Sequence, residues 1–117
     1  MPVLSRKEHQ RAEPYPGVQR WLLVDGDAGA RSLQVGDMTI GPGARVSTHV
    51  HNNTEEAMVI LEGELEAVLG DQVATVRAGD TVLAPPGVKH GFVNRSATPA
   101  RLMFVFPTTT VHRELVE

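Results

Sequence analysis

The chain has 117 residues and no cysteine, so it is long enough for one domain with one hydrophobic core, while disulfides, thiolate metal sites and cysteine nucleophiles are excluded. A formal net charge of −3 provides no basic surface for nucleic acid or for anionic membranes. The longest apolar run, AMVIL, is too short to cross a bilayer, and the polar N-terminal segment has no signal-peptide core, so we expect a cytoplasmic protein.

Three segments are predicted along the chain. Residues 1–20 are polar and interrupted by proline, and without a core-forming period they are expected to form an N-terminal arm. Residues 21–107 carry the domain, and residues 108–117 form a tail in which a threonine could cap a short amphipathic helix. Short apolar or alternating runs bounded by Gly, Pro or Asp predict strands at 20–26, 31–41, 56–63, 64–70, 73–79, 81–87, 90–94 and 101–107.

The spacing of these strands predicts the fold class. The segment ELEAVLGDQVATV reads as a hairpin in which Leu65, Ala67 and Leu69 share one face. Several short strands at this spacing, without a long helical period, favour an all-β antiparallel sandwich or barrel. The sequence contains no internal repeat and no linker that would indicate a second domain.

Two histidines lie one residue apart in the stretch HVHNNTEEAMVILEGE. On a strand, His49 and His51 would project from one face with their Cα atoms about 6.6 Å apart, close enough to bind one metal ion. Glu55 or Glu56 enters the next strand after a turn, and His90 follows a proline turn elsewhere in the chain. Each feature alone is typical of solvated residues. Together, three imidazoles and one carboxylate suit iron, manganese, nickel, cobalt, zinc or copper, and do not suit calcium.

A longer motif surrounds the first histidines. Gly43 is followed by five residues, by His49 and His51, by four residues, by Glu56, and after six more residues by Gly63. This spacing resembles the first conserved motif of the cupin superfamily.

The second motif of the same superfamily is matched further along. Gly79 is followed by five residues, by Pro85 and Gly87 separated by one residue, by His90 after two residues, and by Asn94 after three. The two motifs together span residues 43–94, and two matched motifs in order are far more specific than either one alone.

The resemblance implies a double-stranded β-helix, the jelly-roll barrel of cupins, and therefore an all-β fold. Glu56 is the expected carboxylate because the six residues before Gly63 count from it, and Glu55 then faces away. The resemblance also implies one bound divalent transition metal ion, held by His49, His51, Glu56 and His90.

Apolar residues on the inner faces are expected to form the walls of a substrate pocket. Arg45 lies four positions before His49, so simple alternation places it on the inner face, where it could meet an anionic compound. Asn94 shares a face with His90 and would either support the site or anchor a turn. The remaining candidate pocket residues are Met38, Ile40, Met58, Ile60, Phe92 and part of the group Met103, Phe104, Val105 and Phe106.

Three functions fit this site. A mononuclear metalloenzyme, acting as a dioxygenase, isomerase or lyase on a small oxygenated and anionic compound, is favoured because four protein ligands leave open metal positions. A non-catalytic module that binds or senses a small molecule such as a sugar or carboxylate is the alternative, and a purely structural metal site is the third. Small cupins also commonly pair through sheet edges, so we expect a homodimer.

Overall fold

The computed structural model describes residues 2–116, so Met1 of the predicted arm and Glu117 of the predicted tail lie outside the described residues. One short 3-10 helix, η1 (Arg6–Glu8), precedes the strands. The strands are β1 (Arg11–Tyr15), β2 (Val18–Val24), β3 (Gln34–Ile40), β4 (Arg45–Val50), β5 (Glu56–Glu62), β6 (Glu64–Leu69), β7 (Gln72–Arg77), β8 (Thr81–Ala84), β9 (His90–Val93), β10 (Ala100–Phe106) and β11 (Glu114–Leu115).

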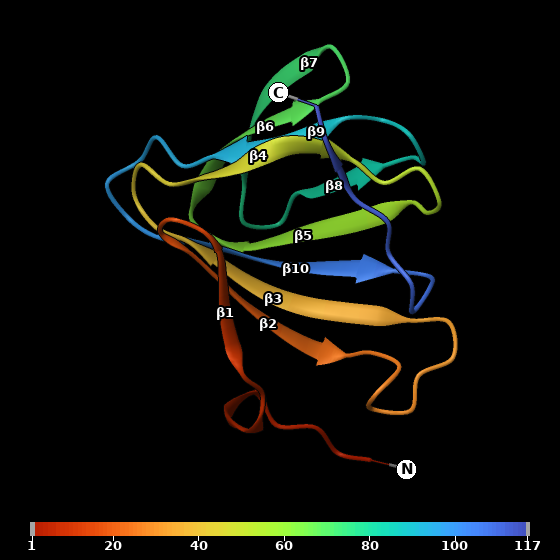
Figure 1. Cartoon of the computed structure of the whole chain (residues 1–117). Helices are drawn as coiled ribbons and strands as arrows, with labels where there is room; N and C mark the ends of the chain where they lie inside the picture. Colours follow the sequence, from red (N-terminus) through yellow and green to blue (C-terminus); the bar gives the residue numbers. More distant parts are fainter. Residues whose placement is uncertain (1, 117) are drawn as a thin grey trace.

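The strands form two antiparallel sheets that face each other (Figure 1). The six-stranded sheet has the order β1-β2-β3-β10-β5-β8, and the five-stranded sheet has the order β11-β4-β9-β6-β7. Strands that are distant in sequence are neighbours in both sheets, which is the connectivity of a jelly-roll, double-stranded β-helix barrel. The predicted all-β fold class is therefore confirmed. Within residues 2–116, no helix has the length and hydrophobicity needed to span a membrane.

Strict alternation of side chains builds the core between the sheets. On β10, Leu102, Phe104 and Phe106 are buried, whereas Met103 and Val105 lie on the outer face. This settles the inward face of the last long strand, which the sequence pattern left open. The predicted hairpin is also present, with β6 pairing β7 and with Leu65 and Ala67 buried.

A glycine ends β5 where the sequence motif places one. Gly63 has a φ of +81°, a left-handed conformation that favours glycine, and it lies in the one-residue turn between β5 and β6. A Cβ atom there would lie 2.8 Å from the carbonyl oxygen of Pro99. The turn therefore needs a glycine for its backbone conformation and for space.

The N-terminal segment takes a larger part in the fold than expected. Strand β1 pairs with β2, and Val18 is completely buried in the core, so the expectation that residues 1–20 form an arm without core-forming residues is wrong at Val18. The guanidinium of Arg6 lies 3.7 Å above the ring of Trp21, and its Nε lies 3.1 Å from the buried carboxylate of Asp37. These contacts attach the segment to the outer face of the six-stranded sheet.

The C-terminal tail is extended, and the predicted helix is wrong. Glu114 and Leu115 pair with β4 as strand β11. The side chain of Asn53 donates a hydrogen bond to the carbonyl oxygen of Thr110 and accepts one from the amide of His112. β-Branched residues at 108–111 reduce helix propensity, and these contacts hold the backbone extended beside β4.

Strand β4 contains an irregularity that reverses its alternation. Val46 pairs with Phe92 and His49 pairs with His90, so three steps along β4 match two along β9. One extra residue in a strand is a β-bulge. Arg45 is consequently exposed instead of facing inward, which corrects the expectation from simple alternation.

Gly91 lies opposite this bulge. A Cβ atom at this position would lie 2.8 Å from the carbonyl oxygen of Val46 and 3.2 Å from the backbone nitrogen of Thr48. The absence of a side chain therefore permits the close approach of β9 to the bulged strand, which sets the position of His49.

Candidate metal centre

Four side chains from three strand ends converge between the sheets. One nitrogen or oxygen of each lies within 4.8 Å of the corresponding atom of every other, and the four side chains are His49, His51, Glu56 and His90. All four are buried, with exposed fractions of 2–6%. His49 lies near the end of β4 and His51 directly after it, whereas Glu56 and His90 begin β5 and β9. The fold thus brings together all four sequence-predicted ligands.

Backbone carbonyls set the tautomer of all three imidazoles. Nδ1 of His49 lies 2.7 Å from the carbonyl oxygen of Ser47, and Nδ1 of His90 lies 3.0 Å from that of Val88. Nδ1 of His51 lies 2.8 Å from the carbonyl oxygen of His112 in the tail. A carbonyl can only accept, so each Nδ1 carries the proton and each neutral imidazole offers its Nε2 lone pair to the centre.

The Glu56 carboxylate faces two of these Nε2 atoms. Its Oε1 lies 2.8 Å from Nε2 of His90 and 3.4 Å from Nε2 of His51. Two neutral lone pairs cannot donate to a carboxylate, so a cation is required between them. That cation is either a proton on an imidazole or a metal ion bound by all four groups.

Burial and hydrogen bonding shift the pKa values in this cluster. Burial lowers the pKa of His49 from 6.5 to about 4, so this imidazole is neutral at physiological pH. Burial also disfavours the charged forms of His51 and Glu56 and is the largest single effect on each. For His51, the hydrogen bonds to Glu56 and to the carbonyl of His112, together with the charge of Glu56, outweigh it, and for Glu56 the hydrogen bonds and charges of His51 and His90 do so. The pKa of His51 is therefore raised and that of Glu56 is lowered.

The donor set fits a divalent transition metal. Three neutral imidazoles, each oriented by a backbone carbonyl, and one carboxylate match the ligands preferred by iron, manganese, cobalt, nickel, copper and zinc. A calcium site would require six or more oxygen ligands, which these residues do not supply. The residues present therefore fit the expected metal, although the donor set does not choose among these ions.

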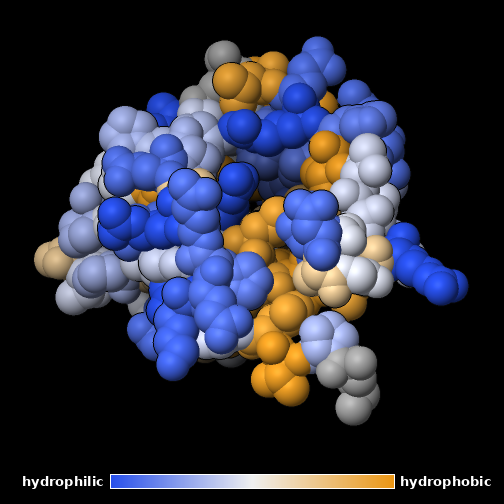
Figure 2. Space-filling view, turned by 60° about the horizontal axis from the view of Figure 1, so that its bottom comes forward, coloured by the Kyte–Doolittle hydropathy of each residue, from blue (hydrophilic) through white to orange (hydrophobic). Residues whose placement is uncertain are grey.

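A cavity of about 510 Å³ opens beside the four ligands. Figure 2 shows a hollow in the surface of the molecule, with hydrophobic residues along it and hydrophilic residues around it. Of the predicted pocket residues, Met38, Met58 and Phe92 line the cavity, together with Phe104 and Phe106 of the last long strand. The walls next to the ligands are therefore mainly apolar.

The other predicted pocket residues lie elsewhere. Ile40 and Ile60 are buried in the core and do not line the cavity. Arg45 is exposed for the reason given above. Asn94 is fully buried, and its side chain donates to the carbonyl oxygens of Ile40 and Thr98, so it anchors a turn instead of contacting the ligands.

Residues from both ends of the chain complete the cavity, and sequence reasoning missed them. Tyr15 of β1, Arg20 of β2 and Arg113 of the tail all line it. The alternation Val18, Arg20, Leu22 was the available signal for Arg20, because an arginine there interrupts an otherwise apolar face. Tyr15 and Arg113 had no comparable signal, since their segments carry no clear period.

Comparison with known proteins supports the fold and the motifs. The chain is 38% identical over 88 residues to Protein SchB of Streptomyces halstedii, covering 75% of this chain and 64% of that protein. It is 32% identical over 102 residues to Polyketide synthase CurC of Streptomyces cyaneus, covering 87% of this chain and 66% of that protein. The chain thus spans less than two thirds of the length of both relatives.

A solved structure shows the same architecture over the whole chain. The polyketide cyclase RemF from Streptomyces resistomycificus superposes with a TM-score of 0.86, covering 100% of this chain and 86% of that chain at 24% sequence identity. At this level of identity the likeness establishes the fold. The family model of the cupin domain matches residues 36–113, about two thirds of the sequence, and includes all four candidate ligands. The chain is therefore a member of the cupin family.

Proposed function

We propose that the protein binds one divalent transition metal ion through His49, His51, Glu56 and His90 and uses it to enolise a small β-dicarbonyl compound. The observation that carries this proposal is the convergence of three Nε2 lone pairs and one carboxylate beside an apolar cavity of about 510 Å³. Such a cavity has the size of a small-molecule site.

The charge of the centre favours an oxygen-rich ligand that becomes anionic. Three neutral imidazoles and one carboxylate leave a divalent ion with a net charge of about +1. A bound metal would act as a Lewis acid on a carbonyl oxygen and so make the neighbouring C–H more acidic. Glu56 is the single carboxylate among the described residues that line the cavity, and two arginines accompany it.

The side chains of this protein would direct the reaction in two ways. Met38, Met58 and Phe92 exclude water from the dicarbonyl compound, which strengthens electrostatic interactions near the ligands. Glu56 contacts the imidazoles through Oε1, so Oε2 is the atom we assign as acceptor of the proton that leaves carbon.

The names of the relatives agree with this class of compound. CurC is named as a polyketide synthase, and polyketide chains carry ketones on alternate carbons. We therefore propose a β-dicarbonyl or poly-β-ketone compound in preference to a sugar or a simple carboxylic acid. Enolisation of such a chain is the first step of ring closure and also of simple proton transfer between carbons.

Cobalt-loaded protein offers a direct test. Benzoylacetone, a phenyl β-diketone, is expected to shift the visible bands of bound Co²⁺, and NMR in D₂O is expected to show faster exchange of its α-protons than free Co²⁺ produces. The His90→Ala protein should do neither. Unmoved cobalt bands with no faster exchange would refute the proposal. Oxygen consumption would assign a dioxygenase instead, and binding without exchange would favour the non-catalytic alternative.

A further inference from the structure

An arginine occupies the inner face of β2. Val18, Arg20 and Leu22 alternate on the same side of this strand, Val18 lies in the core and Leu22 packs against it. Arg20 lies between them and lines the cavity. A charged side chain on the inner face of a barrel loses hydration, so its position calls for a partner.

Two polar atoms in this part of the cavity are buried without a partner. Among the described residues, Nε of Arg20 and the hydroxyl oxygen of Tyr15 are both enclosed and make no hydrogen bond. Buried atoms of this kind are rare in folded proteins, and each needs an explanation. Each of the two side chains thus has one donor without a partner, and both side chains line the same cavity. An acceptor bound in the cavity would satisfy both donors.

A second guanidinium belongs to the same end. Arg113 also lines the cavity, and its Cζ lies 5.0 Å from the centre of the Tyr15 ring. Burial lowers the pKa of Arg113, so part of its hydration is lost as well. Tyr15, Arg20 and Arg113 are defined here as the distal cluster. The distal cluster presents two guanidinium groups, which can only donate, and one hydroxyl that can donate, and its net charge is positive.

Arg20 is well separated from the carboxylate of the candidate metal centre, whereas Arg113 directly follows His112, whose carbonyl oxygen contacts His51. Arg20, Met38, Leu102 and Ile60 lie in one row across four strands, as their pairing shows. Glu56 lies four residues from Ile60 along β5. Three strand spacings and four residues place the Cα atoms of Arg20 and Glu56 roughly 19 Å apart along the sheet. A two- or three-carbon acid is too short to meet both groups.

We infer that the distal cluster is a subsite for an oxyanion at the far end of an elongated ligand whose near end reaches the metal. The inference rests on the proposed function for the near end and adds a charge and a length to the ligand. Tyr15 and Arg20 donate hydrogen bonds to the carboxylate or phenolate oxygen, and Arg113 supplies positive charge at the rim.

Three hydroxamates test the metal end and the distal end of the ligand separately. Acetohydroxamate reaches only the metal, octanohydroxamate adds an apolar chain, and suberic monohydroxamate ends the same chain in a carboxylate. With metal-loaded wild-type protein, calorimetric titration is expected to show at least tenfold tighter binding of the suberic probe than of octanohydroxamate, because a buried charge-assisted contact is gained.

Variants assign this preference to the distal cluster. Arg20→Met should reduce the ratio of the two affinities to about one, and Tyr15→Phe should reduce it in part. Both should leave acetohydroxamate binding unchanged. Arg31→Met is the matched control, since Arg31 is exposed and does not line the cavity.

The outcomes distinguish the two proposals. Equal affinities of the two long probes, or a ratio unaffected by Arg20→Met, would overturn the inference if acetohydroxamate still binds. Binding of none of the three probes would overturn the proposed function and the inference together. Arg20→Met should unfold at an unchanged or higher temperature, because it removes a buried Nε without a partner. If Arg20→Met misfolds, Tyr15→Phe tests the same ratio of affinities, because it removes only one oxygen atom.

Discussion

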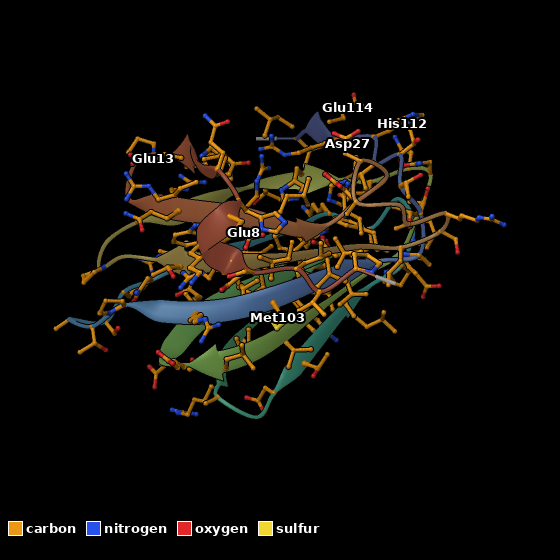
Figure 3. All side chains as sticks on the ribbon, turned by 90° about the horizontal axis from the view of Figure 1, so that it is seen from below. Glu8, Glu13, Asp27, Met103, His112 and Glu114 are labelled. Carbon is orange, nitrogen blue, oxygen red and sulfur yellow. The ribbon has the colours of Figure 1, made fainter. Side chains whose placement is uncertain are left out.

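The carbonyl oxygen of His112 accepts a hydrogen bond from Nδ1 of His51 at 2.8 Å, across 61 residues of sequence. Figure 3 shows His112 and Glu114 of the tail together at one side of the molecule. The other two imidazoles receive the same type of contact from carbonyls two residues before them. One candidate metal ligand, His51, is therefore oriented by a segment that contributes no candidate ligand itself.

Loosening the tail should weaken metal binding. Asn53 holds the tail through Thr110 and His112, so Asn53→Ala should lower the affinity for Zn²⁺ several-fold, and deletion of residues 112–117 should lower it about tenfold or more. Competition with a chelating dye measures both. Asn52→Ala is the control, because Asn52 lies next to Asn53 in the sequence and is exposed as well. Equal affinities of all four proteins would show that the tail carbonyl has no role.

Two adjacent acids should differ in their effect on the metal. Glu56 is 6% exposed and contacts His51 and His90, whereas Glu55 is exposed. Glu56→Gln should remove most bound metal, because it deletes the single anionic ligand, and Glu55→Gln should leave one ion per chain. Elemental analysis after gel filtration measures the content. The reverse result would show that the register of β5 differs by one residue.

The stability of metal-free protein should fall between pH 6.5 and pH 4. Burial lowers the pKa of His49 from 6.5 to about 4, so in this window the unfolded chain binds a proton that the folded chain does not. The free energy of unfolding should therefore decrease by about 3 kcal/mol as the pH falls across the window.

The raised pKa of His51 adds no slope in this window, because its stabilisation is fully present below pH 6.5 and is lost as the pH rises above that value. Urea unfolding of EDTA-treated wild type and His49→Leu at several pH values isolates the His49 contribution. Parallel stability curves for the two proteins would contradict it.

A methyl group on Gly91 should disturb the metal ligands. Its Cβ would lie 2.8 Å from the carbonyl oxygen of Val46, so Gly91→Ala must displace the bulged part of β4 and should cost about 1–3 kcal/mol of stability. Metal affinity should fall with it, because His49 follows this bulge. Gly26→Ala is the control, since its Cβ would meet Thr109 only at 3.8 Å. Denaturant unfolding and dye competition report both effects.

The homodimer expected to form through sheet edges stays a prediction, and we assign it to the β8 edge of the six-stranded sheet with the adjoining outer face. Leu61 and Leu83 are 37% and 52% exposed there, and Met103 projects from the same side. Light scattering should give about twice the 12.7 kDa of one chain. Leu83→Lys should shift the mass to the monomer, and Val73→Lys on the other sheet should not. A monomeric wild type would refute the prediction.

The convergence of the four candidate ligands could be predicted from sequence because it depends on spacing. His49, His51 and Glu56 lie within eight residues, at the end of β4, directly after it and at the start of β5. Alternation predicts the common direction of His49 and His51, and the spacing of the first motif adds Glu56. Their meeting with His90 required a known pattern of strand pairing, which the second motif supplied. Alternation likewise predicts that Met58 and Ile60 face inward with Glu56, and all three are buried.

The far side of the cavity could not be predicted in the same way. The bulge in β4 depends on the approach of Gly91 from another strand, so counting back from His49 gave Arg45 the wrong face. Tyr15 and Arg113 reach the cavity through pairing of β1 with β2 and of β11 with β4. Such pairings depend on long-range contacts that a local residue pattern does not contain.

The contact between His112 and His51 also has a consequence for biosynthesis. A ribosome adds the residues of a chain in order, so His51 emerges long before the carbonyl that orients it. Until residues 112–115 have emerged, β11 cannot pair with β4, and the imidazole of His51 lacks its acceptor. We therefore predict that the candidate metal centre is completed only after residues 112–115 have been synthesised and have paired with β4, and that chains truncated before them hold a metal ion poorly.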